Sequence, residues 1–131
     1  MRLTATITCL LATSLLCAGS GPDLPFTENK GQWPANVLYR ASIPGGVLFV
    51  ERDALTYVLR RGGPKHAHHD PNEAEEPLLL HAYRVTFEGA RGGRPEGNFK
   101  QTHYENHFIG NDPAHWGTRC GVYGEVWVKG I

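Results

Sequence analysis

Residues 37–60, VLYRASIPGGVLFVERDALTYVLR, decide the fold of this chain. The stretch holds three short apolar or alternating runs, at residues 37–42, 47–51 and 55–60. Between the first two runs, Pro44 presets a negative φ and Gly45 accepts a positive one, which is typical of a tight turn. Strands joined by tight turns pair antiparallel, because parallel strands need long crossover connections. The stretch therefore predicts an antiparallel meander.

The rest of the chain continues the β pattern. Residues 78–88 alternate Tyr83, Val85 and Phe87 with polar side chains, which predicts a half-buried strand. Residues 99–108 and 122–128 are interpreted as further strand-like segments. Residues 26–33 are interpreted only as a segment that leads into the first strand, and 89–97 as a turn-rich link.

A short helical turn is predicted after Gly110. Asp112 can cap the free amides of such a turn, and Pro113 suits its first position. We expect this turn to run through His115 and Trp116. The fold class expected is all-β, an antiparallel β-sandwich-like domain. Because the last strand is followed only by residues 129–131, we expect the domain to be truncated at its C-terminus.

The first twenty residues are typical of a signal peptide. Arg2 provides a positive charge, residues 3–17 carry none, and small residues follow at 18–20. The apolar run is too short for a membrane span of about 20 residues, so we expect no transmembrane segment. We predict a signal peptide at 1–20, a domain at 21–131, and a secreted or cell-surface location. Lipidation at Cys17 is the alternative, disfavoured by the large Leu16.

Composition argues against nucleic acid as a partner. The chain has 13 Lys+Arg and 13 Asp+Glu, so loss of Arg2 with the signal leaves 12 against 13, a net charge of −1. Such a surface has no electrostatic footprint for nucleic acid or anionic membranes. Cleavage also removes Cys9 and Cys17. Cys120 is then the lone cysteine, and we expect it to be buried rather than paired with another chain.

Residues 61–77 are predicted to form a long flexible loop, since they carry no apolar side chain larger than Ala apart from three prolines. Its histidine run could bind Zn²⁺, Cu²⁺ or Ni²⁺, and its acidic run could attract Ca²⁺. We favour a solvated loop, because a specific site needs fixed geometry and neighbouring groups that orient the ligands. The residues concerned are His66, His68, His69, Asp70, Glu73, Glu75 and Glu76.

Two other groups of side chains are candidate sites. His103, Glu105 and His107 occupy alternate positions, which on a strand point to one face. They form either a small site with two ligands and a base, or a polar outer face, which we favour. Trp33, Trp116 and Trp127 form either a sugar-stacking platform or anchors of the core and edges, and we favour packing.

No motif for catalysis is present. The sequence contains no GxSxG, P-loop, dinucleotide-binding or HExxH pattern. Ser42 is the single serine after Ser20, which removes most serine-nucleophile schemes. We therefore expect no enzyme activity, no catalytic or metal-binding residues and no cofactor.

Several segments together resemble one family. They are FTENKGQWP (26–34), VLYRA (37–41), PGG (44–46) with LTY (55–57), HAYRV (81–85) with FEGA (87–90), and NHFIGNDP (106–113) with Trp116. This set resembles the N-terminal domain of unknown function of very large Bacteroidetes surface proteins, and the resemblance covers residues 26–131. His107 departs from the family pattern, which has an aromatic residue there.

The resemblance implies a place in a larger protein. In that family the domain follows a signal peptide and precedes SBBP-type β-propeller repeats, PKD or other Ig-like modules and a type IX secretion sorting domain. The family pattern also continues past residue 128, and it has no established catalytic residues to transfer.

The function expected is that of a non-enzymatic structural or adhesive accessory domain of a secreted or cell-surface protein. Its expected partners are downstream β modules of the same chain, and extracellular glycans or surface proteins. The alternatives are a carbohydrate-binding module, and the N-terminal part of a secreted hydrolase whose catalysis lies downstream.

Overall fold

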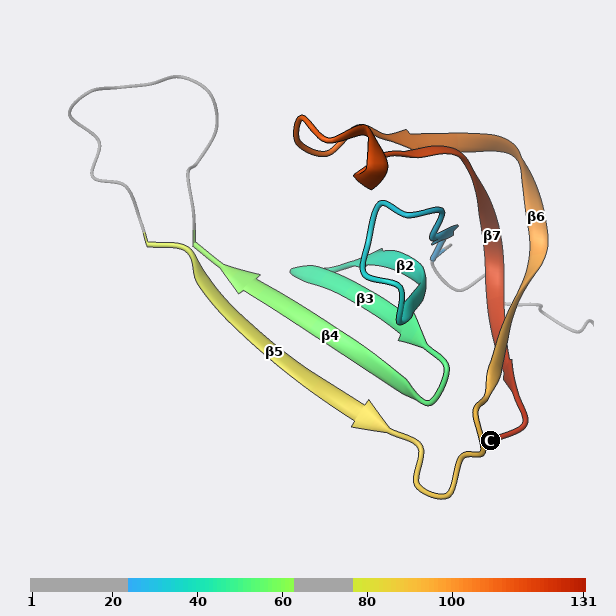
Figure 1. Cartoon of the computed structure of the whole chain (residues 1–131). Helices are drawn as coiled ribbons and strands as arrows, with labels where there is room; N and C mark the ends of the chain where they lie inside the picture. Colours follow the sequence, from blue (N-terminus) through green and yellow to red (C-terminus); the bar gives the residue numbers. More distant parts are fainter. Residues whose placement is uncertain (1–23, 63–76) are drawn as a thin grey trace, which may run out of the picture.

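The structure is a computed structural model that describes residues 24–62 and 77–131. Its elements within these residues are β1 (Phe26–Glu28), β2 (Val37–Ile43), β3 (Gly46–Glu51), β4 (Ala54–Arg61), β5 (Leu79–Thr86), β6 (Arg94–His107), the 3₁₀ helix η1 (Pro113–His115) and β7 (Gly117–Lys129) (Figure 1). The all-β prediction is confirmed. So is the helical turn, because the Asp112 carboxylate accepts a hydrogen bond from the Ala114 amide at 2.9 Å.

The described strands form one antiparallel sheet in the order β5-β4-β3-β2-β1-β7-β6. The predicted meander is confirmed and extends through β5, since each strand from β2 to β5 pairs with the next. The interpretation of residues 26–33 is corrected, because β1 pairs with β2 on one side and β7 on the other. A strand of three residues with one large apolar side chain shows no period in sequence, so pattern analysis missed it.

The hydrophobic core lies largely on one face of the meander. Ala41 on β2 pairs with Leu48 on β3, and Val50 follows Leu48 by two residues, so all three side chains share that face. They are 1%, 8% and 2% exposed. A second buried group lies on β7, where Cys120 and Val122 are both 0% exposed.

Strands β6 and β7 form a long hairpin that bends near its middle (Figure 1). The half of the hairpin next to η1 lies over the loop between β1 and β2 (Figure 1). The other half, which contains the start of β6, contacts the meander, where the Gly97 amide donates to the Tyr39 hydroxyl at 3.0 Å. A Cβ atom at position 97 would lie 2.5 Å from the Tyr123 ring, so this approach requires glycine. The bend gives the single sheet its sandwich-like form, as predicted.

Strand β5 is more exposed than its sequence predicts. All eight of its residues are exposed, although the alternation of Tyr83 and Val85 predicts a half-buried strand. β5 stands at the end of the strand order and pairs only with β4 among the described residues. An alternating pattern shows which face of a strand is apolar, but it cannot show whether another layer covers that face.

Two predicted boundaries also change. The predicted loop began at residue 61, but Arg61 is the last residue of β4, and residues 63–76 lie outside the described part of the chain. The predicted link at 89–97 is shorter, because β6 already begins at Arg94. In both cases the strand extends over polar or proline-containing residues. There, cross-strand hydrogen bonds rather than an apolar period define the strand.

A buried carboxylate ties the meander together. Glu51, the last residue of β3, is 5% exposed. It accepts hydrogen bonds from Thr56 on β4 at 2.6 Å, from Asn36 at 3.0 Å and from Arg84 on β5 at 2.9 Å. Burial by itself would raise the pKa of Glu51, but these donors and the charge of Arg84 outweigh it and hold the pKa below its ordinary value.

We expect Glu51→Gln to lower the free energy of unfolding near neutral pH by about 1–3 kcal/mol, because an amide cannot accept all three hydrogen bonds. Since the folded-state pKa of Glu51 lies below the unfolded value, its stabilisation is present above the unfolded pKa. It is lost as the pH falls through the folded pKa. Urea unfolding of both proteins at a series of pH values should therefore show a difference that shrinks in acid.

The matched control is Glu88→Gln, which changes an exposed glutamate just after β5 and should leave stability unchanged. Equal stability of Glu51→Gln and the wild type near neutral pH would contradict the assignment. A difference that does not depend on pH would also contradict it.

Candidate functional site

The loop between β1 and β2, residues 29–36, is shaped by one amide side chain. The Asn29 Oδ1 atom accepts hydrogen bonds from the amides of Gly31 at 2.9 Å and Trp33 at 3.2 Å. The Asn29 Nδ2 atom donates to the carbonyls of Trp33 at 3.1 Å and Val37 at 2.7 Å. The Asn29 side chain thus gives the loop an acceptor for its backbone amides and a donor for its backbone carbonyls.

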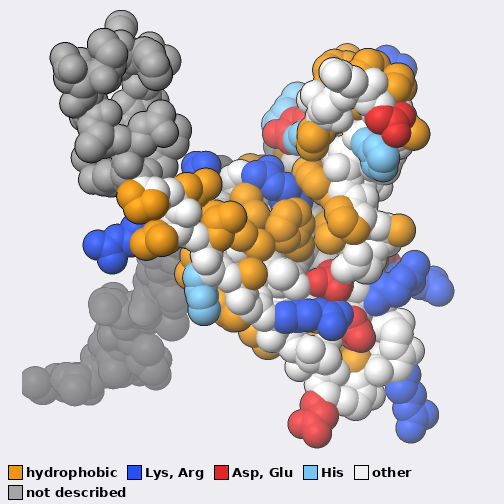
Figure 2. Space-filling view, turned by 60° about the vertical axis from the view of Figure 1, so that its left-hand side comes forward, with side chains coloured by type: hydrophobic (Ala, Val, Ile, Leu, Met, Phe, Trp, Pro, Cys, Tyr) orange, Lys and Arg blue, Asp and Glu red, His pale blue; other side chains and the backbone are white. Residues whose placement is uncertain are grey.

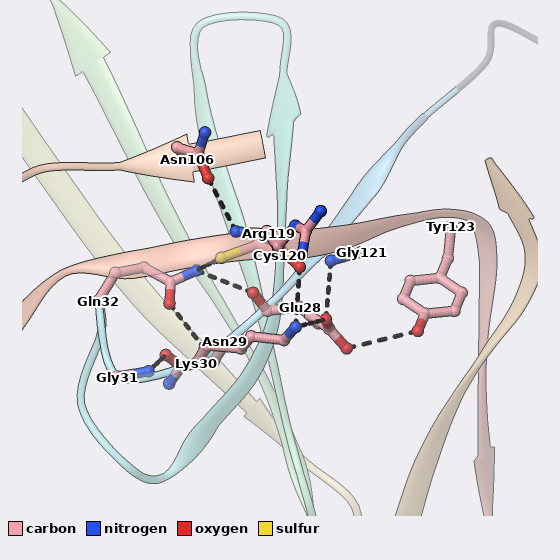
Figure 3. A network of polar contacts seen from close by, with 10 residues as sticks. All are labelled: Glu28, Asn29, Lys30, Gly31, Gln32, Asn106, Arg119, Cys120, Gly121 and Tyr123. Atoms are coloured by element: carbon pink, nitrogen blue, oxygen red, sulfur yellow. Dashed lines mark hydrogen bonds and ion pairs between the residues drawn. The ribbon is translucent and has the colours of Figure 1, made fainter. Parts of the chain in front are cut away.

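A second amide fastens this loop to β7 (Figure 3). Gln32 is 6% exposed, and its Nε2 atom donates to the Glu28 carbonyl at 2.8 Å and contacts the Cys120 sulfur at 3.3 Å. Its Oε1 atom accepts from the Lys30 amide at 2.7 Å. Every polar atom of the Gln32 amide therefore has a partner, which suits its burial.

The Glu28 carboxylate joins β1 to β7 at the same place (Figure 3). It accepts a hydrogen bond from the Gly121 amide at 2.7 Å and pairs with the Lys30 ammonium at 3.0 Å. Burial by itself would raise the pKa of Glu28, but the Gly121 amide and Lys30 outweigh it and lower the pKa. Burial and the nearby Glu28 carboxylate raise the pKa of Tyr123, whose hydroxyl lies 3.4 Å from Glu28.

Arg119 on β7 has an unusual backbone conformation, with a φ of 52°, a value uncommon outside glycine. Neighbouring side chains hold both of its peptide groups. The Asn106 side chain accepts from the Arg119 amide at 2.8 Å, and the Lys30 ammonium donates to its carbonyl at 2.8 Å. These contacts offset the backbone strain at Arg119, where the register of the β6–β7 pairing shifts between Glu105 and His107.

We call the set of side chains that fastens β1 and its loop to β7 the β1–β7 latch. The roles of its polar members were not predicted from the sequence, although these residues lie in the FTENKGQW segment that carries the family resemblance. An available signal was two amide side chains on either side of Gly31, since such residues commonly cap loops. The latch consists of Glu28, Asn29, Lys30, Gln32 and Cys120.

The predicted burial of Cys120 is confirmed, since it is free and 0% exposed. Burial raises the pKa of its thiol, and the Glu28 and Glu105 carboxylates act in the same direction. Because the thiolate is the reactive form, this position keeps the sulfur inert. Cys120 is a packing residue of the latch.

The structure brings together two members of the predicted His103, Glu105 and His107 group. The Glu105 Oε2 atom lies 3.1 Å from the His107 Nε2 atom and accepts a hydrogen bond from the Thr27 hydroxyl at 2.8 Å. His103 is exposed and has no described polar contact with this pair. The pairing of β6 with β7 shifts register between residues 100 and 104, so strict alternation along β6 does not hold there.

The three tryptophans occupy separate places. Trp33 is half-buried and meets the rings of Phe49 at 6.4 Å and His107 at 5.1 Å. Trp116 is half-buried beside η1 and meets Phe108 at 5.3 Å. Trp33 and Trp116 therefore each contact a neighbouring aromatic ring, whereas Trp127 is 52% exposed.

The metal candidates of the sequence lie outside the described residues, so the structure places none of them. They are His66, His68, His69, Asp70, Glu73, Glu75 and Glu76. Within residues 24–62 and 77–131, no group of three or more His, Cys, Asp or Glu side chains is arranged to hold a metal ion. The same residues contain no helix that is long and apolar enough to cross a membrane.

Taken together, the geometry defines an all-β domain whose most elaborate polar cluster is a structural latch. Its carboxylate is paired, its amides are satisfied and its thiol is buried. The half-exposed Glu105–His107 pair is held by the Thr27 hydroxyl, which donates to Glu105, and by Trp33, whose ring meets His107. In both clusters the described contacts hold side chains in place.

Comparison with known proteins gives the family. Residues 26–131 match the family described as Domain of unknown function (DUF7948). The chain therefore belongs to the DUF7948 family, and the match begins at Phe26, the first residue of β1. No curated protein matches the chain, and no solved structure matches it.

The latch predicts a slowly reacting thiol. In a chain with Cys9→Ser and Cys17→Ser, Cys120 should react with an aromatic disulfide reagent on the order of a hundredfold more slowly in the native state than in urea. Gln32→Ala should accelerate the native reaction, because it frees the loop that covers the sulfur. Absorbance of the released thiol measures both rates.

The control chain carries Thr102→Cys and Cys120→Ala in the same background, which moves the thiol to an exposed position on β6. It should react at nearly the same rate with and without urea. If native Cys120 reacts as fast as this control, the latch does not shield it.

Proposed function

We propose that this domain is a non-enzymatic structural module of an exported, multidomain polypeptide, and that it docks a β-rich module through its β5 edge. The signal-like segment at residues 1–20 supports export to a secreted or cell-surface location. The observation that carries the proposal is the exposed apolar strand β5. The internal contacts of the described polar clusters support a structural role.

The β5 edge carries apolar side chains on both faces of the strand. Leu79, Tyr83 and Val85 alternate on one face and are 60%, 43% and 44% exposed, while Leu80 on the other face is 65% exposed. Leu78 precedes them and is 53% exposed. Figure 2 shows hydrophobic side chains in a band that crosses this side of the molecule. Patches of this kind on soluble domains mark interaction sites.

The apolar face of β5 continues the core of the meander. Leu48 pairs with Tyr57 and Tyr57 with Tyr83, so the three side chains form a row across β3, β4 and β5. The rings of Tyr57 and Tyr83 stack at 4.9 Å. Leu48 is 8% exposed and Tyr83 is 43% exposed. The apolar side chains of this face are therefore less buried toward the β5 edge. A partner packed against β5 would complete this layer.

The backbone of β5 indicates what kind of partner can bind at this edge. An edge strand presents unpaired amide and carbonyl groups on one side, and these groups accept another strand. Natural sheets protect free edges with charged side chains or prolines. On β5 the one residue with a fixed charge is Arg84, and it is already paired with Glu51 and Asp53. The edge is therefore suited to a β-strand of alternating apolar pattern.

The family resemblance suggests which module this partner is. We propose that the polypeptide is a large Bacteroidetes surface protein, and that the partner is a β-propeller or Ig-like module of the same polypeptide. The contacts of Trp33 and Trp116 with neighbouring aromatic rings support this structural role over carbohydrate binding.

Site-specific photocrosslinking tests the proposal. A benzophenone amino acid replaces Tyr83 in the exported polypeptide, made in its own host. We expect cross-links to a strand of another β-rich module of that polypeptide. The matched control replaces Arg91, an exposed residue in the link between β5 and β6, and should give few cross-links. Mass spectrometry of the linked peptides identifies the partner.

A second variant separates docking from misfolding. Leu79→Lys with Val85→Lys should abolish the cross-links from position 83 and leave the circular dichroism of the domain unchanged, since both side chains are exposed. The proposal fails if position 83 links no more than position 91. It also fails if the links lead only to a second copy of this chain.

A further inference from the structure

The face of the meander opposite to Tyr83 contains a hollow of about 210 Å³. Its floor is apolar: Val47 on β3 pairs with Val58 on β4, and Leu80 on β5 stands beside them. Its rim is polar and basic. The lining residues are Arg40, Ser42, Ile43, Gly46, Val47, Val58, Arg60 and Leu80.

The sheet register places one arginine on each side of this floor. Val47 pairs with Ser42 as well as with Val58. Arg40 precedes Ser42 by two residues on β2, and Arg60 follows Val58 by two residues on β4, so both arginines share the face of the floor. Ser42 lies on the same face of β2, between Arg40 and the turn that follows the strand.

The charges around the hollow have one sign. Its described lining contains two guanidinium groups and no carboxylate. Arg84 on β5 points to the same face and pairs with Thr56, two residues before Val58 on β4. Its charge is neutralised by the Glu51 and Asp53 carboxylates. No described carboxylate forms an ion pair with Arg40 or Arg60. Among the described residues, the two arginines therefore give this hollow a local positive potential.

One of the two arginines is held in place. The Arg40 guanidinium lies over the ring of Trp33, 5.7 Å from its centre, and Trp33 is itself packed against Phe49 and His107. A guanidinium stacked on an aromatic ring keeps its edge free for hydrogen bonds to an oxyanion. A held donor also loses less conformational freedom when it binds.

We propose that this hollow binds a small organic anion, a carboxylate attached to a short apolar body. The carboxylate would accept a hydrogen bond from Ser42 and lie in the positive potential of Arg40 and Arg60, and the body would lie on Val47 and Val58. Ligand pockets commonly have volumes of about 300–1,000 Å³, so a hollow of 210 Å³ suits a ligand of only a few heavy atoms. This inference does not rest on the β5 docking proposal.

Titration of the ¹⁵N-labelled chain with butyrate, followed by NMR, tests the site. Butyrate should produce saturable shifts of the amides of Ser42, Val47 and Val58. Butyramide is its neutral isostere and should produce none. Arg40→Gln and Arg60→Gln should each weaken butyrate binding by about tenfold. The matched control, Arg52→Gln, removes an exposed arginine of the β3–β4 turn and should leave the affinity unchanged.

Each result decides the proposal. Equal shifts with butyramide, or unchanged affinity in both arginine variants, would overturn it. Inorganic phosphate that binds as tightly as butyrate would also overturn it, because phosphate has no apolar body to use the valine floor. Arg60 is exposed, so Arg60→Gln remains informative even if Arg40→Gln disturbs the packing of Trp33. The measurement uses this chain alone, so its failure would leave β5 docking untouched.

Discussion

The architecture depends on the pairing of β1, a strand of only three residues. Within the described residues, β1 connects the meander to the β6–β7 hairpin, because it pairs with β2 on one side and β7 on the other. A three-residue strand offers few backbone hydrogen bonds, so the junction would be weak by itself. The β1–β7 latch supplies the missing contacts through the Glu28 carboxylate and the Gln32 amide. Around this junction the two halves of the sheet take their relative positions.

The latch also gives the residues of one sequence segment their structural roles. In the segment FTENKGQW, Phe26 and Thr27 pair within the sheet, Asn29 shapes the loop, Gln32 reaches β7, and Trp33 packs on the hairpin. Residues of this kind are easily taken for a binding or catalytic site, since several are polar and close together. Their hydrogen bonds are directed inward to backbone groups and to the sulfur, which identifies them as part of the scaffold.

Part of this structure could be predicted from local pattern. Strands β2, β3 and β4 and the turn at Gly45, whose φ is 74°, follow from apolar runs and turn residues. The burial of Cys120 and the cap at Asp112 were predictable for similar reasons. The candidate site was not, because Gln32 and Cys120 are 88 residues apart in sequence, and no local period indicates that they meet. The grouping of His103 with Glu105 and His107 failed in part because a register shift interrupts β6.

By itself, the sequence determined which segments of the meander become strands, how its turns form, and which of its faces is apolar. These properties depend on φ preferences and on side-chain alternation over a few residues. Only the tertiary structure decided that β1 lies inside the sheet between β2 and β7, that Glu51 is buried among three donors, and that β5 is at the edge of the described sheet. The reason is physical: burial and edge position depend on which strands meet across long sequence separations, and such meetings are decided by the packing of the whole domain.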